Sequence, residues 1–411
     1  MKPSHLSFLS AAALIALFPG FFLYNAAVAG GVIPAVLGGW FGPMTLLLGV
    51  PLILSFFLLH VFSGRLIFID VMFLLYLLYI VSWASLHFAL GARAQTSEAF
   101  YLYNLGTVIQ WVVLYVAVRN VELRNKWFGA ILLFSLVCFL AIAMSSAEGQ
   151  FYDTATIAGG SATDVSGYQG LARSTAVTAM LLLAIYRGFP AVLVMIVTVP
   201  TLFLLGARSE FVGFLVVALC HFAVREGLSR TTLIWAPLGI GAIAYAAMGA
   251  HVLEGGSRIL QLLEIQEATS YQARGELMRQ ALITISEHPV LGGYASQFSY
   301  GGMGDYSHNA LSAWVTYGLI GFLGFVALLA YALVQALRLI RRAGSAHPQL
   351  ALALAFSIYA ATLAATSKSV NDPIFALAWG AIAAAMASHR HKLRRGWRPT
   401  RVVQPRRLTV V

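Results

Sequence analysis

Residues 127–147 have the sequence WFGAILLFSLVCFLAIAMSSA, which places 21 residues without a charged side chain between Lys126 and Glu148. About 20 apolar residues in a helix cross the hydrocarbon core of a lipid bilayer. The run lacks the alternation of apolar and polar residues that barrel strands show. Because lipid offers the backbone no hydrogen-bond partner, this stretch predicts a membrane-spanning helix.

The rest of the chain repeats this pattern. Of its 411 residues 60% are hydrophobic and 10% are charged, whereas soluble domains carry about 25% charged residues. The first apolar segment follows Met1 and is too long for a signal sequence, so we expect an uncleaved helix. Twelve segments of about one crossing each predict an all-α polytopic membrane protein. They are 7–28, 43–62, 66–90, 100–118, 127–147, 170–187, 190–206, 209–224, 231–250, 308–337, 349–368 and 372–388.

The basic residues give this topology a direction. With both ends of the chain in the cytoplasm and alternating crossings, 19 of the 26 Lys and Arg residues fall inside, as the positive-inside rule requires. The outer side then carries seven: Arg93, Arg173, Arg208, Arg258, Arg274, Arg279 and Lys368.

Four regions follow from the twelve segments. Residues 1–250 hold the first nine helices, residues 251–307 form an outer loop, residues 308–388 hold the last three helices, and residues 389–411 form a basic cytoplasmic tail. We expect the tail to lie on anionic lipid head groups and not to bind nucleic acid. In the outer loop, helical spacing puts Leu277, Ala281, Leu282 and Ile285 on one face. His288-Pro289 then predicts the end of an amphipathic helix lying at the outer membrane surface.

Two arginines begin apolar segments on the outer side. Arg208 lies in LLGARSEF, where its planar fork of donors could hold a phosphate group; a salt bridge to Glu210 is the alternative. Arg173 lies in YQGLARST and is either a second phosphate ligand or an interfacial anchor. Charges beside the apolar layer are costly and usually face a cavity or a partner.

The outer loop holds the other candidates. Arg274 and Arg279 flank Glu276 in ARGELMRQAL, and these residues alone favour a solvated helix face with ordinary ion pairs. His308 follows the loop, and a neutral imidazole there is suited to general-base catalysis, although it could instead cap the next helix. Its neighbour Asn309 could orient it or a substrate.

Several cofactor and metal motifs are absent from the sequence. It has no nucleotide-binding glycine loop and no HExxH, and Cys138 and Cys220 lack ligand spacing. We therefore expect no metal, no cofactor and no disulfide.

The second half of the chain resembles the O-antigen ligase and O-antigen polymerase family of bacteria. That family shows an arginine heading a short helix, a turn of the form hPllG.G, a His-Asn pair and a GliG helix, in that order. Here these are Arg274, residues 288–293 (HPVLGG), His308-Asn309 and residues 318–321 (GLIG). Upstream, Ala207-Arg208-Ser209 is similar to a further motif of the family.

The resemblance implies a GT-C-like glycosyltransferase of the bacterial inner membrane with its active site facing the periplasm. The donor would be a glycan on undecaprenyl pyrophosphate, with no nucleotide sugar and no required metal. Arg208 and Arg274 would bind the pyrophosphate and His308 would be catalytic; Arg173, Arg279 and Asn309 are further candidate substrate contacts. A ligase would take lipid A–core as its acceptor, and a polymerase a second lipid-linked glycan. A transporter with arginines along its path is the alternative from another class.

Overall fold

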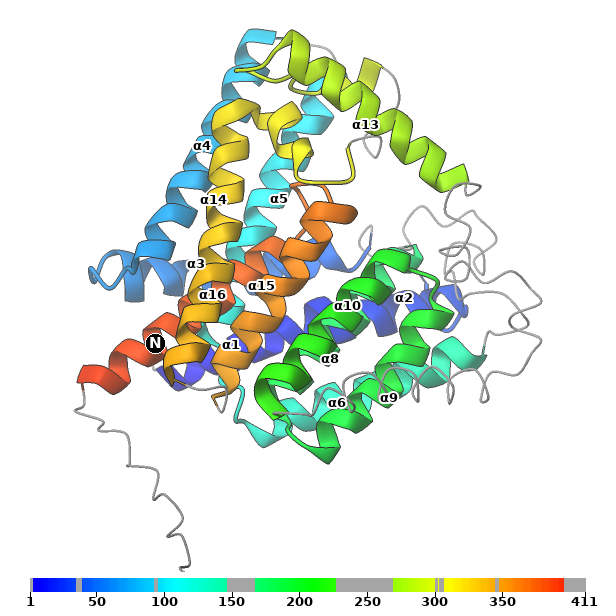
Figure 1. Ribbon diagram of the computed structural model, residues 1–411, viewed down its shortest axis with the longest axis vertical. Coiled ribbons are helices and arrows are strands. Elements are labelled where there is room, and N and C mark those ends of the chain that lie inside the picture. Colours follow the sequence, from blue (N-terminus) through cyan, green and yellow to red (C-terminus); the bar gives the residue numbers. More distant parts are fainter. Residues whose placement is uncertain are drawn as a thin grey trace, which may run out of the picture.

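The computed structural model describes residues 3–34, 39–91, 95–145, 167–226, 269–299, 302, 307–343 and 347–394 (Figure 1). Every regular element in these ranges is helical, with η1 to η3 π-helical and η5 a 3₁₀ turn. In chain order they are α1 (Pro3–Ile15), η1 (Ala16–Gly20), α2 (Phe21–Ala29), α3 (Phe41–Phe56), η2 (Phe57–Val61), α4 (Phe68–Gly91), α5 (Gln95–Asn120), α6 (Lys126–Ser145), α8 (Tyr168–Ile185), α9 (Phe189–Leu204), α10 (Arg208–His221), η3 (Phe222–Glu226), α13 (Thr269–Glu287), η5 (Ser296–Ser299), α14 (Leu311–Ala343), α15 (Pro348–Thr366) and α16 (Ile374–Arg394).

Seven stretches of the described chain are long and apolar enough to cross a membrane. Helices α9 and α16 are shorter apolar helices. Helices α8 and α10, which correspond to the predicted segments 170–187 and 209–224, are not among the seven. The predicted segment 231–250 lies outside the described residues, so the total of twelve crossings stays a prediction. The seven are Ser4–Ala29, Phe41–Val61, Phe68–Leu90, Glu98–Asn120, Lys126–Ser145, Leu311–Arg342 and Pro348–Thr366.

The centre of the bundle is α16. Every residue from Ile374 to Ala385 is buried, and the helix packs against α5, α14 and α15 (Figure 1). A helix that is apolar on all sides is typical of a protein core or a membrane span, and α16 has the first of these positions. Small residues allow the close packing: a Cβ atom on Gly380 would lie 2.5 Å from the Tyr115 carbonyl oxygen of α5.

The outside of the bundle is apolar as well. Large hydrophobic side chains are exposed along α3, α4, α6 and α14, among them Leu47, Leu78, Phe134 and Leu323. A soluble monomer rarely exposes such continuous apolar surface. Together with the seven long helices, this surface makes the chain a membrane protein.

Helix α13 crosses one end of the bundle, at the top of Figure 1. It ends at Glu287, directly before His288-Pro289, as the sequence predicts. Ala281 and Thr284 are buried against the bundle, Leu277 and Ile285 are half-buried, and Leu282 is 50% exposed.

Helix α14 is broken near its start. Gly318 has φ 69° and ψ −176°, a conformation essentially confined to glycine. The turn that follows α13 fits against this break: Leu319 donates its N–H to the Val290 carbonyl oxygen at 2.9 Å, and Gly293 donates to the Val315 oxygen at 2.8 Å. The two glycine motifs of the sequence therefore meet in space.

The break leaves carbonyl oxygens without their helical partners, and α4 supplies donors for two of them. Tyr79 donates its hydroxyl to the Tyr317 oxygen at 2.7 Å, and Trp83 donates its indole N–H to the Thr316 oxygen at 3.1 Å. In a membrane protein an unsatisfied backbone group is costly. These bonds therefore fix the direction of the short piece Leu311–Tyr317, which leads back to His308.

Candidate functional site

The His308-Asn309 pair forms the turn that starts α14. The Asn309 side-chain oxygen accepts a hydrogen bond from the Leu311 N–H at 2.9 Å and another from the Ser307 hydroxyl at 2.8 Å. This is the hydrogen bonding of a helix N-cap, so Asn309 caps α14, not His308 or Ser307. His308 lies half-buried directly before the cap.

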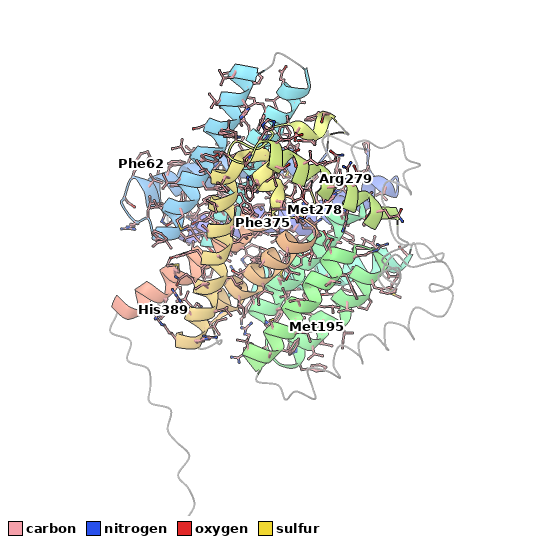
Figure 2. All side chains as sticks on the ribbon, turned by 45° about the horizontal axis from the view of Figure 1, so that its top comes forward. Phe62, Met195, Met278, Arg279, Phe375 and His389 are labelled. Atoms are coloured by element: carbon pink, nitrogen blue, oxygen red, sulfur yellow. The ribbon has the colours of Figure 1, made fainter. Side chains whose placement is uncertain are left out.

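Helix α13 lies against this turn. The Asn309 side-chain nitrogen is 3.3 Å from the sulfur of Met278, a residue labelled on α13 in Figure 2. Arg274 is exposed one helical turn before Met278, and residues four apart share a helix face. The structure therefore puts Arg274 on the face of α13 that meets the His308-Asn309 turn.

Arg279 points to a different side of α13. At 3.6 residues per turn it lies about 140° around the helix from Arg274. Its guanidinium makes two hydrogen bonds to Glu276, at 2.8 and 2.6 Å. The hydrogen bonds from Arg279 and Gln280 lower the pKa of Glu276 to about 2. Both side chains of the pair are more than half exposed, which is the solvated ion pair that the residues alone predict.

The connection between α15 and α16 joins this turn to the rest of the bundle. Val370 donates its N–H to the Ser312 hydroxyl at 2.7 Å, and Tyr317 donates its hydroxyl to the Asn371 side-chain oxygen at 2.9 Å. The same Tyr317 hydroxyl also contacts Asn104 of α5. The first two turns of α14 are therefore attached to residues 370–371.

A buried ion pair extends the connection to α10. Lys368 places its Nζ atom 2.6 Å from a carboxylate oxygen of Glu210, and the two side chains are 8% and 1% exposed. Glu210 also accepts the Ser209 hydroxyl at 2.7 Å. Arg208 is the first residue of α10, so it lies within the same helical turn as Glu210. Lys368 is thus an ion-pair partner of Glu210 that the sequence did not predict.

A second ion pair joins the connection to α8. Arg173 contacts Asp372 at 2.9 Å. The other Asp372 side-chain oxygen accepts the Ile374 N–H at 3.0 Å and so caps α16. Gln169, in the first turn of α8, accepts a hydrogen bond from Lys368 at 3.2 Å. We call Arg173, Glu210, Lys368 and Asp372 the charge cluster.

The candidate residues thus fall into three groups. Arg274, His308 and Asn309 belong to the contact between α13 and α14. Arg173, in the second turn of α8, belongs to the charge cluster, and Arg208 begins α10 two residues before the cluster's Glu210. Arg279 stands apart in its exposed pair.

Sequence reasoning missed the roles of Lys368, Glu210 and Asp372. The sequence did contain a signal, because Lys368 and Asp372 lie four residues apart between two apolar segments. Buried charges are seldom found without partners.

The described ranges contain no group of three His, Cys, Asp or Glu side chains placed to hold a metal ion. Comparison with models of known protein families gives no match, and no curated protein sequence matches the chain. The fold defines a helical membrane protein, and the site consists of the contact between α13 and α14 and the charge cluster joined to it through residues 368–372. The resemblance to the O-antigen ligase and polymerase family remains a prediction that rests on the quoted residues.

Proposed function

We propose that this protein is an O-antigen ligase-type glycosyltransferase. It would transfer a glycan from undecaprenyl pyrophosphate to an acceptor hydroxyl, that of lipid A–core, at the periplasmic face of the bacterial inner membrane. The observation that carries the proposal is the contact between Asn309 and Met278. It brings the face of α13 that bears Arg274 to His308, while Ser312 and the charge cluster link the same turn to the helix that begins with Arg208.

The chemistry follows from the groups that meet there. The acceptor oxygen attacks the anomeric carbon of the donor sugar as His308 takes its proton. The bond from that carbon to the pyrophosphate oxygen breaks, and the lipid pyrophosphate leaves with the bonding electron pair. Arg208 and Arg274 stabilise the negative charge that develops on it, an effect that is strongest in a poorly hydrated site. One displacement inverts the anomeric centre.

Point variants of the purified protein test these roles. With a lipid-pyrophosphate glycan donor and lipid A–core, we expect His308→Ala to abolish transfer and to keep donor binding. Arg208→Lys should weaken donor binding, because a point charge does not replace the planar fork. Wild-type turnover in His308→Ala would remove His308 from the mechanism.

A polymerase would use the same donor and a second lipid-linked glycan as acceptor. Deletion in the native cell separates the two. Lipid-linked polymer beside unmodified lipid A–core supports the ligase, whereas loss of long chains with single repeats still transferred supports the polymerase. Transfer in detergent, where no membrane gradient exists, would exclude transport as the primary role.

A further inference from the structure

A pocket of about 510 Å³ opens beside Arg173, away from the contact between α13 and α14. Its volume is within the range of about 300–1,000 Å³ typical of small-molecule sites. Two unlike walls form it. One is apolar, from the N-terminal helices, and the other is polar, from the start of α8. The lining residues are Leu17, Phe18, Phe21, Phe41, Gln110, Gly167, Tyr168, Gln169, Gly170, Arg173, Ser174 and Pro373.

The polar wall is suited to an anion. It includes the first turn of α8, an 18-residue helix that starts at Tyr168, and the N-terminus of a helix carries a partial positive charge. Arg173 lies on the next turn. Within the charge cluster the exposed fractions are 24% for Arg173, 6% for Asp372, 8% for Lys368 and 1% for Glu210. The Arg173 side chain therefore faces the pocket, and the carboxylates of Asp372 and Glu210 are buried behind it.

The apolar wall is a set of aromatic rings. Phe41 of α3 contacts Phe18 and Phe21, with ring centroids 6.5 and 5.8 Å apart. Phe18 and Leu17 belong to the π-helical turn η1, where the Trp40 indole donates to the Ala16 carbonyl oxygen at 2.7 Å. Such π-turns occur frequently at functional sites. The turn and the Trp40 bond keep the rings in place opposite Arg173.

We infer that this pocket binds a phosphate-bearing membrane lipid. The phosphate would lie against Arg173 and the first turn of α8, and the start of the lipid chain against Phe21 and Phe41, which the buried Phe18 supports from behind. A free phosphate would leave the aromatic wall unused, and a neutral lipid would leave the arginine unused. The lining of the pocket does not include Arg208, Arg274 or His308, and the inference does not depend on the proposed transferase activity.

Thermal unfolding of the full-length protein in detergent tests this site with farnesyl phosphate as the probe. A bound ligand raises the unfolding midpoint, and we expect a rise of about 2 °C or more at saturation. Farnesol and inorganic phosphate, which each carry half of the probe, should give less than half of that rise. An equal rise with farnesol, or none with farnesyl phosphate, would overturn the inference.

Point variants test whether the rise of the unfolding midpoint comes from binding in this pocket. The double variant Arg173→Gln with Asp372→Asn removes the cation without stranding a buried carboxylate, and Asn still caps α16. It should lose the rise, as should Phe21→Ala, which leaves all charges in place. Phe134→Ala on the exposed surface of α6 is the matched control and should keep it. Arg208→Gln removes binding of the probe at the proposed donor site, and adding the two pocket substitutions Arg173→Gln and Asp372→Asn to it should remove the rise that remains. If farnesyl phosphate still raises the unfolding midpoint of both pocket variants, it binds outside this pocket. The same conclusion follows if the rise disappears completely in Arg208→Gln.

Discussion

At the scale of single residues, two arginines five positions apart on α13 have different surroundings. Arg274 lies on the face that meets Asn309 through Met278, whereas Arg279 is bound to Glu276 on the solvent side. Spacing in the sequence suggested a solvated face for both. The difference depends on which face α13 turns toward α14, and that is set by contacts distant in sequence.

We therefore predict that Arg274→Gln strongly reduces glycan transfer and Arg279→Gln does not. The exposed pair contributes little to stability, so Arg279→Gln should also unfold at nearly the wild-type temperature. Transfer assays and melting curves on the two purified variants check this. Equal losses of activity would contradict the inference that the face of α13 bearing Arg274 and Met278, and not the face bearing Arg279, contacts the donor.

Asn309 offers a second comparison at this scale. Asn309→Asp keeps the oxygen that caps α14, whereas Asn309→Ala removes it, which costs about 1 kcal/mol. We predict that the alanine variant melts at a lower temperature than the aspartate variant. If the two melt together, the cap does not hold the turn.

At the scale of elements, the break in α14 and the turn after α13 depend on two glycines. A Cβ atom on Gly292 would lie 2.6 Å from the Val315 oxygen, and one on Gly318 would lie 2.6 Å from the Val290 oxygen. Both have positive φ angles. The sequence shows the glycines, but the meeting of the two motifs requires the docking of α13 on α14, which no local pattern specifies.

Gly292→Ala and Gly318→Ala should each destabilise the protein by more than about 2 kcal/mol, from backbone strain and steric overlap together. Gly275 is the matched control, because a Cβ atom there meets nothing within 4 Å. Gly275→Ala in α13 should stabilise by up to roughly 1 kcal/mol through helix propensity. Thermal unfolding measures all three, and a tolerated Gly318→Ala would show that the break can close.

At the scale of the whole molecule, the connection between α15 and α16 ties four helices together. Lys368 bonds to α10, and Val370 and Asn371 bond to α14. Asp372 bonds to α8 through its side chain and to Trp111 of α5 through its carbonyl oxygen. The long helices could be predicted from the sequence because lipid selects for apolar length. The pairing of Lys368 with Glu210 could not, since it requires knowing which helices are neighbours.

Lys368→Met should therefore be strongly destabilising, by about 3–5 kcal/mol, because it leaves the Glu210 carboxylate buried and unpaired. The double variant Lys368→Met with Glu210→Gln should recover most of that loss. Melting curves of the single and double variants make the comparison. If the double variant is no more stable than the single one, Lys368 has a role other than neutralising Glu210.

The break in α14 also divides the helix into a long part that can cross the bilayer and a short part before Gly318. From Leu319 to the residue before Arg338, α14 is about 28 Å long at 1.5 Å per residue, close to the roughly 30 Å of the hydrocarbon layer. The seven residues before Gly318 are then not needed to cross it. With residues 319–337 spanning the hydrocarbon layer, His308 would lie level with the lipid phosphates. Under the proposed function, a carrier lipid could then reach His308 with its chain still among the lipid tails.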